Sequence, residues 1–146
     1  MKFPITRNEL QNFNKKKEIS EKEKEERYKF FNILIEDICN KLENELLNPW
    51  INKNDTKIIW KDIDFLLFWK ELSNSNKCNF YQLSYDNIKN TFNRNYNHPN
   101  YRRTIEQEVK LNEYLIEFID LLKKNFIDCD ITVDPLKTYI IIDWSN

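Results

Sequence analysis

The chain contains no glycine in 146 residues, and this absence limits what it can build. Glycine adopts positive φ without steric cost and lets a backbone or a ligand approach closely. The phosphate-binding loop GxxxxGK[ST], the dinucleotide-binding turn GxGxxG and the nucleophile elbow GxSxG all depend on it. The sequence therefore excludes these three kinds of site. Turns that need a positive φ must use another residue, and asparagine is the expected one.

Alanine is also absent, and Asn, Ile and Lys supply 57 of the 146 residues. Those three residues have AT-rich codons, whereas glycine and alanine have GC-rich codons. The bias indicates an AT-rich genome, such as that of a large DNA virus, a protist or a small parasitic bacterium. We expect a large DNA virus as the source, although this bias carries no information about function.

The length is that of one ordinary domain, and we expect residues 1–146 to form a single one. A content of 40% hydrophobic and 14% aromatic residues is typical of a folded chain. The net charge of −1 provides no overall attraction to nucleic acid or to an anionic membrane. The longest apolar run, residues 65–69, is far too short to cross a bilayer, so no membrane association is expected.

The expected location is the cytoplasm, or the host cytoplasm or virion if the source is viral. Two features of the sequence support this. The first 13 residues contain no apolar segment of the signal-peptide type. The three cysteines are odd in number and widely spaced, which argues against a disulfide framework and for a reducing compartment.

The first 13 residues carry the signals of a short helix of their own. Thr6 and Glu9 have the spacing of a capping box, and the flanking Ile5 and Leu10 have that of a hydrophobic staple. A helix this short is marginal in water, so its apolar side chains must pack on another surface. We expect them to be the residues that bind a partner: Phe3, Ile5, Leu10 and Phe13.

A strongly charged segment follows, in which 12 of the residues 15–29 are charged. Glu and Lys residues of mixed sign at i,i+4 spacing favour a solvated helix, and Ser20 with Glu23 forms a second capping box. From Tyr28 the pattern becomes amphipathic and predicts a helix to about Leu47. Residues 1–27 are thus predicted to be an N-terminal arm and charged helix start that holds the apolar tip away from the domain.

The rest of the chain predicts further helices and a small sheet. Capping residues mark three more helix starts: Asp62 or Asp64, Ser84, and Thr104 with Gln107. Residues 73–76, Ser-Asn-Ser-Asn, are interpreted as a turn.

Three β-rich segments predict the sheet. Residues 57–61 form one strand, and residues 131–133 and 139–144 form a C-terminal hairpin around Asp134. The last strand is apolar almost throughout, so we place it in the centre, between the other two. The predicted fold is α+β, mostly helical, with helices packed on a small antiparallel sheet that includes the C-terminal hairpin.

Candidate metal and catalytic residues are few. His98 is the single histidine, and it lies in an asparagine-rich loop before a proline. With the cysteines it could make a zinc site, but the close C-x₂₋₄-C pairs of structural zinc sites are absent. The thiols concerned are those of Cys39, Cys78 and Cys129. We therefore expect no metal site, no cofactor and no enzymatic activity.

Clustered carboxylates raise the alternative of a metal-dependent hydrolase. The acids beside the hairpin are Asp128, Asp130, Asp134 and Asp143. Asp134 is explained by a turn, and the two aspartates at 62 and 64 by capping. A hydrolase is therefore the third of our hypotheses.

A basic and aromatic segment at residues 87–103 contains no acid and raises the second hypothesis, contact with nucleic acid. Arginine and lysine bind phosphates, and aromatic rings stack on bases. The residues concerned are Lys89, Arg94, Tyr101, Arg102 and Arg103. The first hypothesis is a non-enzymatic interaction or structural protein that docks on a protein partner, or on a second copy of itself, through its N-terminal arm.

Overall fold

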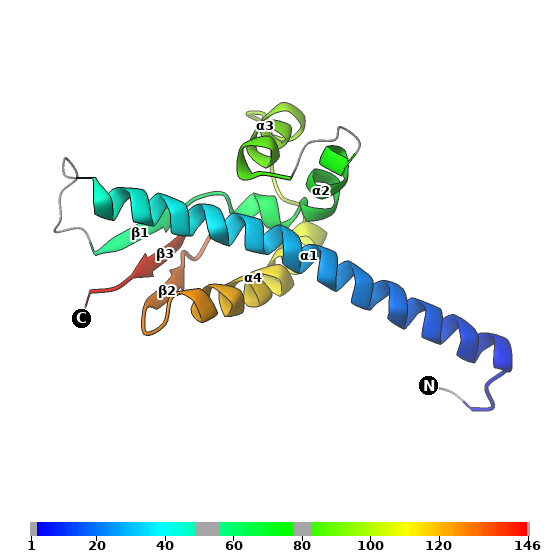
Figure 1. Cartoon of the computed structure of the whole chain (residues 1–146). Helices are drawn as coiled ribbons and strands as arrows, with labels where there is room; N and C mark the ends of the chain where they lie inside the picture. The colour runs from blue at the N-terminus through cyan, green and yellow to red at the C-terminus, as the bar shows by residue number, and fades with distance from the viewer. Residues whose placement is uncertain (1–2, 49–55, 78–82, 146) are drawn as a thin grey trace.

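The computed structural model describes residues 3–48, 56–77 and 83–145. The elements follow in the order α1 (Arg7–Leu47), β1 (Lys57–Trp60), a 3₁₀ helix η1 (Ile63–Leu66), α2 (Trp69–Lys77), α3 (Tyr85–Asn95), α4 (Ile105–Asn125), β2 (Asp130–Val133) and β3 (Ile140–Asp143). In the view of Figure 1, the C-terminal half of α1 has α2 and α3 above it and the sheet and α4 below it. The N-terminal half of α1 extends beyond every other element. The predicted α+β fold is confirmed.

The sheet is antiparallel with the strand order β1-β3-β2, so the predicted central position of the last strand is confirmed. Ile140 of β3 pairs with Trp60 of β1 on one side and with Val133 of β2 on the other. Ile140 and Ile142 are fully buried. Ile141 between them is partly buried, so one face of this strand is fully covered and the other is covered in part.

One hydrophobic core joins the C-terminal half of α1 to the sheet and to the other helices. The ring of Phe118 on α4 lies at its centre. It stacks on Trp60 of β1 at 5.0 Å between centroids and meets Phe31 of α1 edge-on at 5.5 Å. Aromatic pairs in these arrangements add to the free energy gained by burial alone, so this triad ties together sheet, α1 and α4.

The prediction of a separate short first helix and a second helix start at Ser20 is wrong, because α1 is continuous from Arg7 to Leu47. The cap at Thr6 is confirmed: its hydroxyl accepts a hydrogen bond from the Glu9 amide at 3.2 Å. A serine caps a helix only where the chain before it leaves helical geometry, and no proline or glycine lies between Ile5 and Asn48. The i,i+4 pairs therefore let the first turn propagate into the charged segment.

The turn predicted at residues 73–76 is also wrong, since these residues lie inside α2. Ser73 is buried, as is its neighbour Leu72, so packing against the core overrides the turn preference of Ser and Asn. Asp62 precedes η1 but makes no side-chain capping bond. Its carboxylate instead accepts a hydrogen bond from the Tyr85 hydroxyl on α3.

The hairpin turn is built as predicted around Asp134. Its carboxylate accepts hydrogen bonds from the Thr138 amide at 2.5 Å, the Tyr139 amide at 2.9 Å and the Thr138 hydroxyl at 2.7 Å. These bonds lower the pKa of Asp134, although its slight burial acts in the opposite direction. Among the described residues the positive φ values fall on Asp128 (62°) and Lys137 (56°), and none falls on the asparagines that we expected.

Candidate docking surface

The projecting part of α1 is the most exposed feature of the described chain. Every side chain from Arg7 to Lys22 is exposed, whereas the core-facing side of α1 is buried from Phe30 onward. Sixteen helical residues span about 24 Å at 1.5 Å per residue. We call residues 3–22 the arm. Figure 1 shows it leaving the body in the direction of the N-terminus.

The base of the arm is fixed by Arg27, which we call the clamp. Its guanidinium donates to both carboxylate oxygens of Glu117 on α4, from Nε at 2.6 Å and from Nη2 at 2.7 Å. The same group lies over the rings of Trp69 on α2, at 5.7 Å, and Tyr114 on α4, at 5.2 Å. Burial acts to lower the pKa of Arg27, but the bonds to Glu117 outweigh it and raise the pKa. The two-pronged ion pair joins α1 to α4 at the point where the arm leaves the body.

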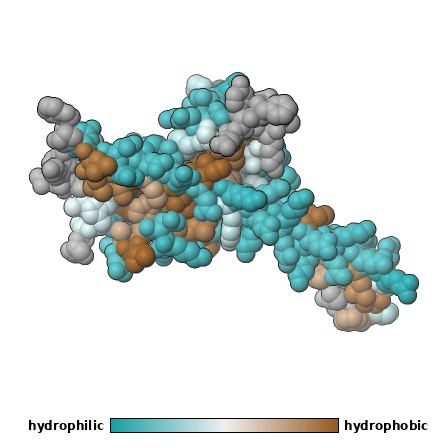
Figure 2. Space-filling view, viewed as in Figure 1, coloured by the Kyte–Doolittle hydropathy of each residue, from teal (hydrophilic) through white to brown (hydrophobic). Residues whose placement is uncertain are grey.

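The free end of the arm carries the apolar residues that the sequence singled out. Phe3 is 74% exposed, Phe13 52% and Leu10 44%, while Ile5 is half-buried. Figure 2 shows hydrophobic residues gathered at this end of an arm that is otherwise mostly hydrophilic. We call these four residues the tip. Because large apolar side chains gathered on an exposed segment mark interaction sites, the tip is the first half of the candidate surface.

Charge is separated along the arm and the turn of α1 that follows it. Residues 7–17 contain four basic residues and one acidic residue, a net charge of +3. Residues 18–26 contain five acidic and two basic residues, a net charge of −3. Opposite charges at the two ends of one exposed helix favour a binding partner with the reverse order of charge.

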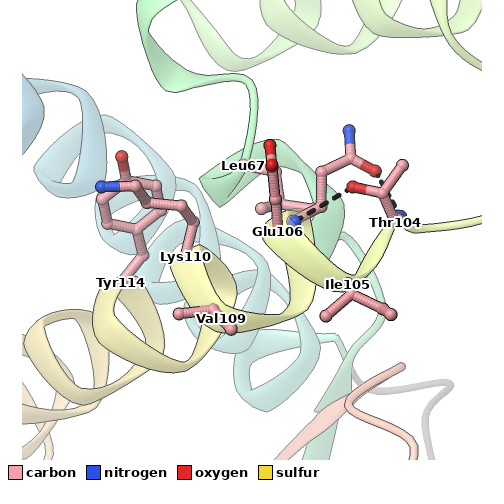
Figure 3. Close-up of a pocket in the computed structure, with 8 residues that line it drawn as sticks. Leu67, Thr104, Ile105, Glu106, Val109, Lys110 and Tyr114 are labelled. Atoms are coloured by element: carbon pink, nitrogen blue, oxygen red, sulfur yellow. Dashed lines mark hydrogen bonds between the residues drawn. The ribbon is translucent and has the colours of Figure 1, made fainter.

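A groove lies on the body at the base of the arm. It has a volume of about 640 Å³, and its apolar lining comes mainly from Leu67 and the first turns of α4. Figure 3 shows Ile105, Val109, Lys110 and Tyr114 projecting from successive turns of α4. Since the Tyr114 ring also contacts the clamp, the groove begins where the arm leaves the body.

The sequence analysis missed both the groove and the clamp. A usable signal for the groove was the pair Ile105 and Val109, which are 85% and 54% exposed. They are one turn apart and lie outside the buried stripe that starts at Leu111. The partner of Arg27 is 90 residues away along the chain, and no local pattern marks it.

The structure divides the predicted basic patch into three parts. Arg103 is tied into the body by Asp64, whose Oδ1 lies 2.7 Å from its Nε, and only 10% of its side chain is exposed. Lys89 is exposed and lines a pocket together with Asp62. Arg94 and Arg102 are exposed.

Tyr101 in the same segment is half-buried. Its hydroxyl is buried and has no hydrogen-bond partner among the described residues. Desolvation raises its pKa to about 12, aided by the negative charge of Asp64. The single histidine, His98, meets the Tyr101 ring edge-on at 6.1 Å.

Among the described residues, the candidates weighed for metal binding and catalysis do not come together. In the described ranges no group of three or more His, Cys, Asp or Glu side chains is placed to hold a metal ion. Cys39 and Cys129 are partly buried thiols, and Cys78 lies outside the described residues. Burial raises the pKa of Cys39, with the charge of Glu36 adding to the effect.

Burial raises the pKa of Asp62 above its usual value, and Asp62 is the one carboxylate among the described residues that shows such a rise. The positive charges of Lys89 and Lys41 act against the rise but do not cancel it. Lys41 also lies over the Tyr85 ring at 4.4 Å. This cluster joins α1, α3 and the start of η1, so it holds the helices together.

Comparison with known proteins gives no relative. No protein-family model, no curated protein and no solved structure matches the chain. In the part of the chain that the structure describes, no helix combines the length and apolar character needed to cross a bilayer.

Proposed function

We propose that this chain is a non-enzymatic interaction protein that docks through its N-terminal arm. The observation that carries the proposal is a rigid, fully solvated helix that presents apolar side chains at its free end. A helix of this composition gains little from its own domain, since Arg7 to Lys22 bury nothing against it. Amphipathic helices that lie in a partner's groove are a common mode of recognition.

The clamp also supports docking through the arm. Here Arg27 is held by Glu117 and two rings, and Glu23 is paired with Lys70 of α2 at 3.4 Å. The arm is thus oriented before it meets a partner, which reduces the entropy lost on binding. The large DNA virus that we expect as the source stays a proposal based on residue composition alone.

The test separates docking from stability. The double variant Leu10→Ser, Phe13→Ser is compared with the parent and with a matched control, Leu46→Ser, which changes a 62% exposed leucine at the other end of α1. All three should melt at the same temperature, because none of these side chains belongs to the core. Mass in solution is then measured for the purified protein and for the protein in an extract of its native source.

We expect the parent and the control to occur in an assembly larger than one chain, and the double variant to be monomeric. Equal masses for parent and double variant would refute the proposal. So would a clear drop in the melting temperature of the double variant, since the segment would then belong to the fold of its own domain.

A further inference from the structure

Two apolar surfaces lie at the two ends of the same stretch of helix. The tip is centred on Leu10 and Phe13, and the groove begins at the clamp, Arg27. Between them lie 14 to 17 residues, a distance of about 21–26 Å along a helix. Because α1 is continuous from Arg7 to Leu47, the tip cannot fold back into the groove of its own chain.

We propose that a second copy of this chain fills both surfaces. The arms of two copies pair antiparallel about a two-fold axis, and the tip of each copy docks in the groove of the other. The inference rests on the proposed function and names its partner. A two-fold interface uses the same patch on both subunits, and a patch made of one tip and one groove is complementary to itself.

The direction of the tip fits this arrangement. Eighteen residues make five turns of an α-helix, so side chains 18 positions apart project from the same side. Leu10 therefore projects from the same side of α1 as Tyr28, and Phe13 from the same side as Phe31. Phe31 packs on Phe118 of α4, so the tip projects on the side of α1 that carries the body. When a second α1 lies antiparallel against that side, its tip arrives at α4 and the groove.

The charges of the arm select the antiparallel direction. A two-fold axis midway between tip and clamp passes near residues 18–20. The C-terminal part of residues 7–17 of one copy, which carries three of the four basic residues of that half, then lies beside the acidic half of the other copy, and residues 7–13 lie beside the segment around the clamp. In a parallel pair the two halves of like charge would lie side by side, which costs free energy of association. Lys15, Lys16 and Lys17 of one copy come level with the acidic stretch 21–25 of the other.

The area of contact shows why the tip is needed. Two arms about 24 Å long, each covered over a strip about 10 Å wide, bury roughly 500 Å² in total. Specific stable complexes bury upward of about 1,200 Å². Pairing of the arms alone therefore falls short, and the two tip–groove contacts must supply the remainder. We expect a dimer that depends on concentration and on the tip.

The decisive experiment reverses the charges of each half in turn. One variant carries Lys15→Glu, Lys16→Glu and Lys17→Glu, which changes residues 7–17 from +3 to −3. A second carries Glu18→Lys, Glu21→Lys and Glu25→Lys, which changes residues 18–26 from −3 to +3. Glu23 is left in place because it pairs with Lys70. Unchanged far-ultraviolet circular dichroism and melting temperature confirm that both variants fold.

Mass by light scattering over a wide range of concentration gives the result. The parent should dimerise, and each variant alone should bind itself at least about tenfold more weakly, since like charges then face each other in the antiparallel pair. A chain carrying both sets of substitutions should dimerise again, because its halves are again opposite in sign. An equal mixture of the two variants should form the heterodimer.

Three outcomes would overturn the inference. One is a parent that is monomeric at every concentration. Another is dimerisation of both charge variants as strong as that of the parent. The third is a doubly substituted chain that stays monomeric. A monomeric parent whose assembly in the native extract is still lost on Leu10→Ser, Phe13→Ser would leave the proposed function standing with a different partner. If the parent is monomeric and the Leu10→Ser, Phe13→Ser variant also leaves the assembly in the native extract unchanged, both this inference and the proposed function are refuted.

Discussion

Replacing Arg103 with alanine should destabilise the fold, although the sequence places this residue in a solvent-exposed basic patch. Its guanidinium joins three parts of the body. Nε donates to Asp64 at 2.7 Å, Nη2 donates to the Lys137 carbonyl at 2.7 Å, and Nη1 donates to the Leu136 carbonyl at 3.2 Å. Glu108 of α4 lies 3.5 Å from Nη1. The side chain therefore bridges η1, α4 and the hairpin turn.

The expected loss follows from these bonds. Hydrogen bonds to a charged group contribute about 1.5–3 kcal/mol each, and removal of one partner of a buried ion pair costs about 3–5 kcal/mol. The Asp64 carboxylate is 29% exposed and can regain water when the arginine is gone, so the lower part of the range applies. We expect a loss of about 2–4 kcal/mol in the free energy of unfolding, or a fall of roughly 6–12 °C in melting temperature.

The neighbouring arginine gives a matched control. Arg102 is exposed and donates one hydrogen bond, to the Tyr101 carbonyl at 2.7 Å, so Arg102→Ala should leave stability unchanged. Arg103→Lys keeps the charge but not the planar fork, and should lie between the parent and Arg103→Ala. Urea unfolding followed by circular dichroism measures all four proteins. The same unfolding midpoint for Arg103→Ala and Arg102→Ala would show that the reasoning is wrong.

Three further predictions concern buried polar groups and the sheet. Tyr101→Phe removes a buried hydroxyl without a described partner and should stabilise the protein by about 1 kcal/mol. It should also make the loss of stability between pH 10 and the folded pKa of about 12 smaller than in the parent, because the folded state favours the neutral phenol of Tyr101. Thermal melts at alkaline pH that weaken both proteins alike would contradict this. Asp62 has a pKa raised above 3.8, so its stabilising effect is fully present below that pH and is lost as the pH rises through the folded pKa. The stability of Asp62→Asn relative to the parent should therefore increase from about pH 4 to about pH 7. The same difference in urea midpoint between variant and parent at the two pH values would refute this. Deletion of residues 138–146 removes the central strand and should abolish cooperative unfolding in calorimetry; a sharp transition near the parental temperature would show that the strand is dispensable.

Local signals in the sequence located the ends of several helices correctly. Thr6, Ser84 and Thr104 all cap their helices through the side-chain oxygen, as their spacing predicts. These signals succeed because a cap involves atoms only three residues apart. The central strand was also correctly placed, since an apolar run such as residues 140–142 favours a position with a neighbouring strand at each edge.

The same kind of signal failed where local preference and context disagree. Ser20 and Glu23 have the spacing of a capping box, but Ser20 lies inside α1, which begins at Arg7. The buried side of α1 includes Phe30, Phe31, Leu34 and Ile35, so it is wider than the single stripe that an amphipathic pattern predicts. A helix covered by α2 and α3 on one side and by α4 on another buries a wider face than a single stripe.

The sequence by itself determined the composition of the arm: its apolar tip, its two halves of opposite charge and the helical preference that makes it rigid. Only the tertiary structure decided which charged residues remain available to a partner. Arg27 and Arg103 are bound by Glu117 and Asp64, 90 and 39 residues away, while Arg102 next to one of them is exposed. A charged side chain looks the same in the sequence whether it faces water or a carboxylate, because its partner is set by the folding of distant segments and not by its neighbours in the chain.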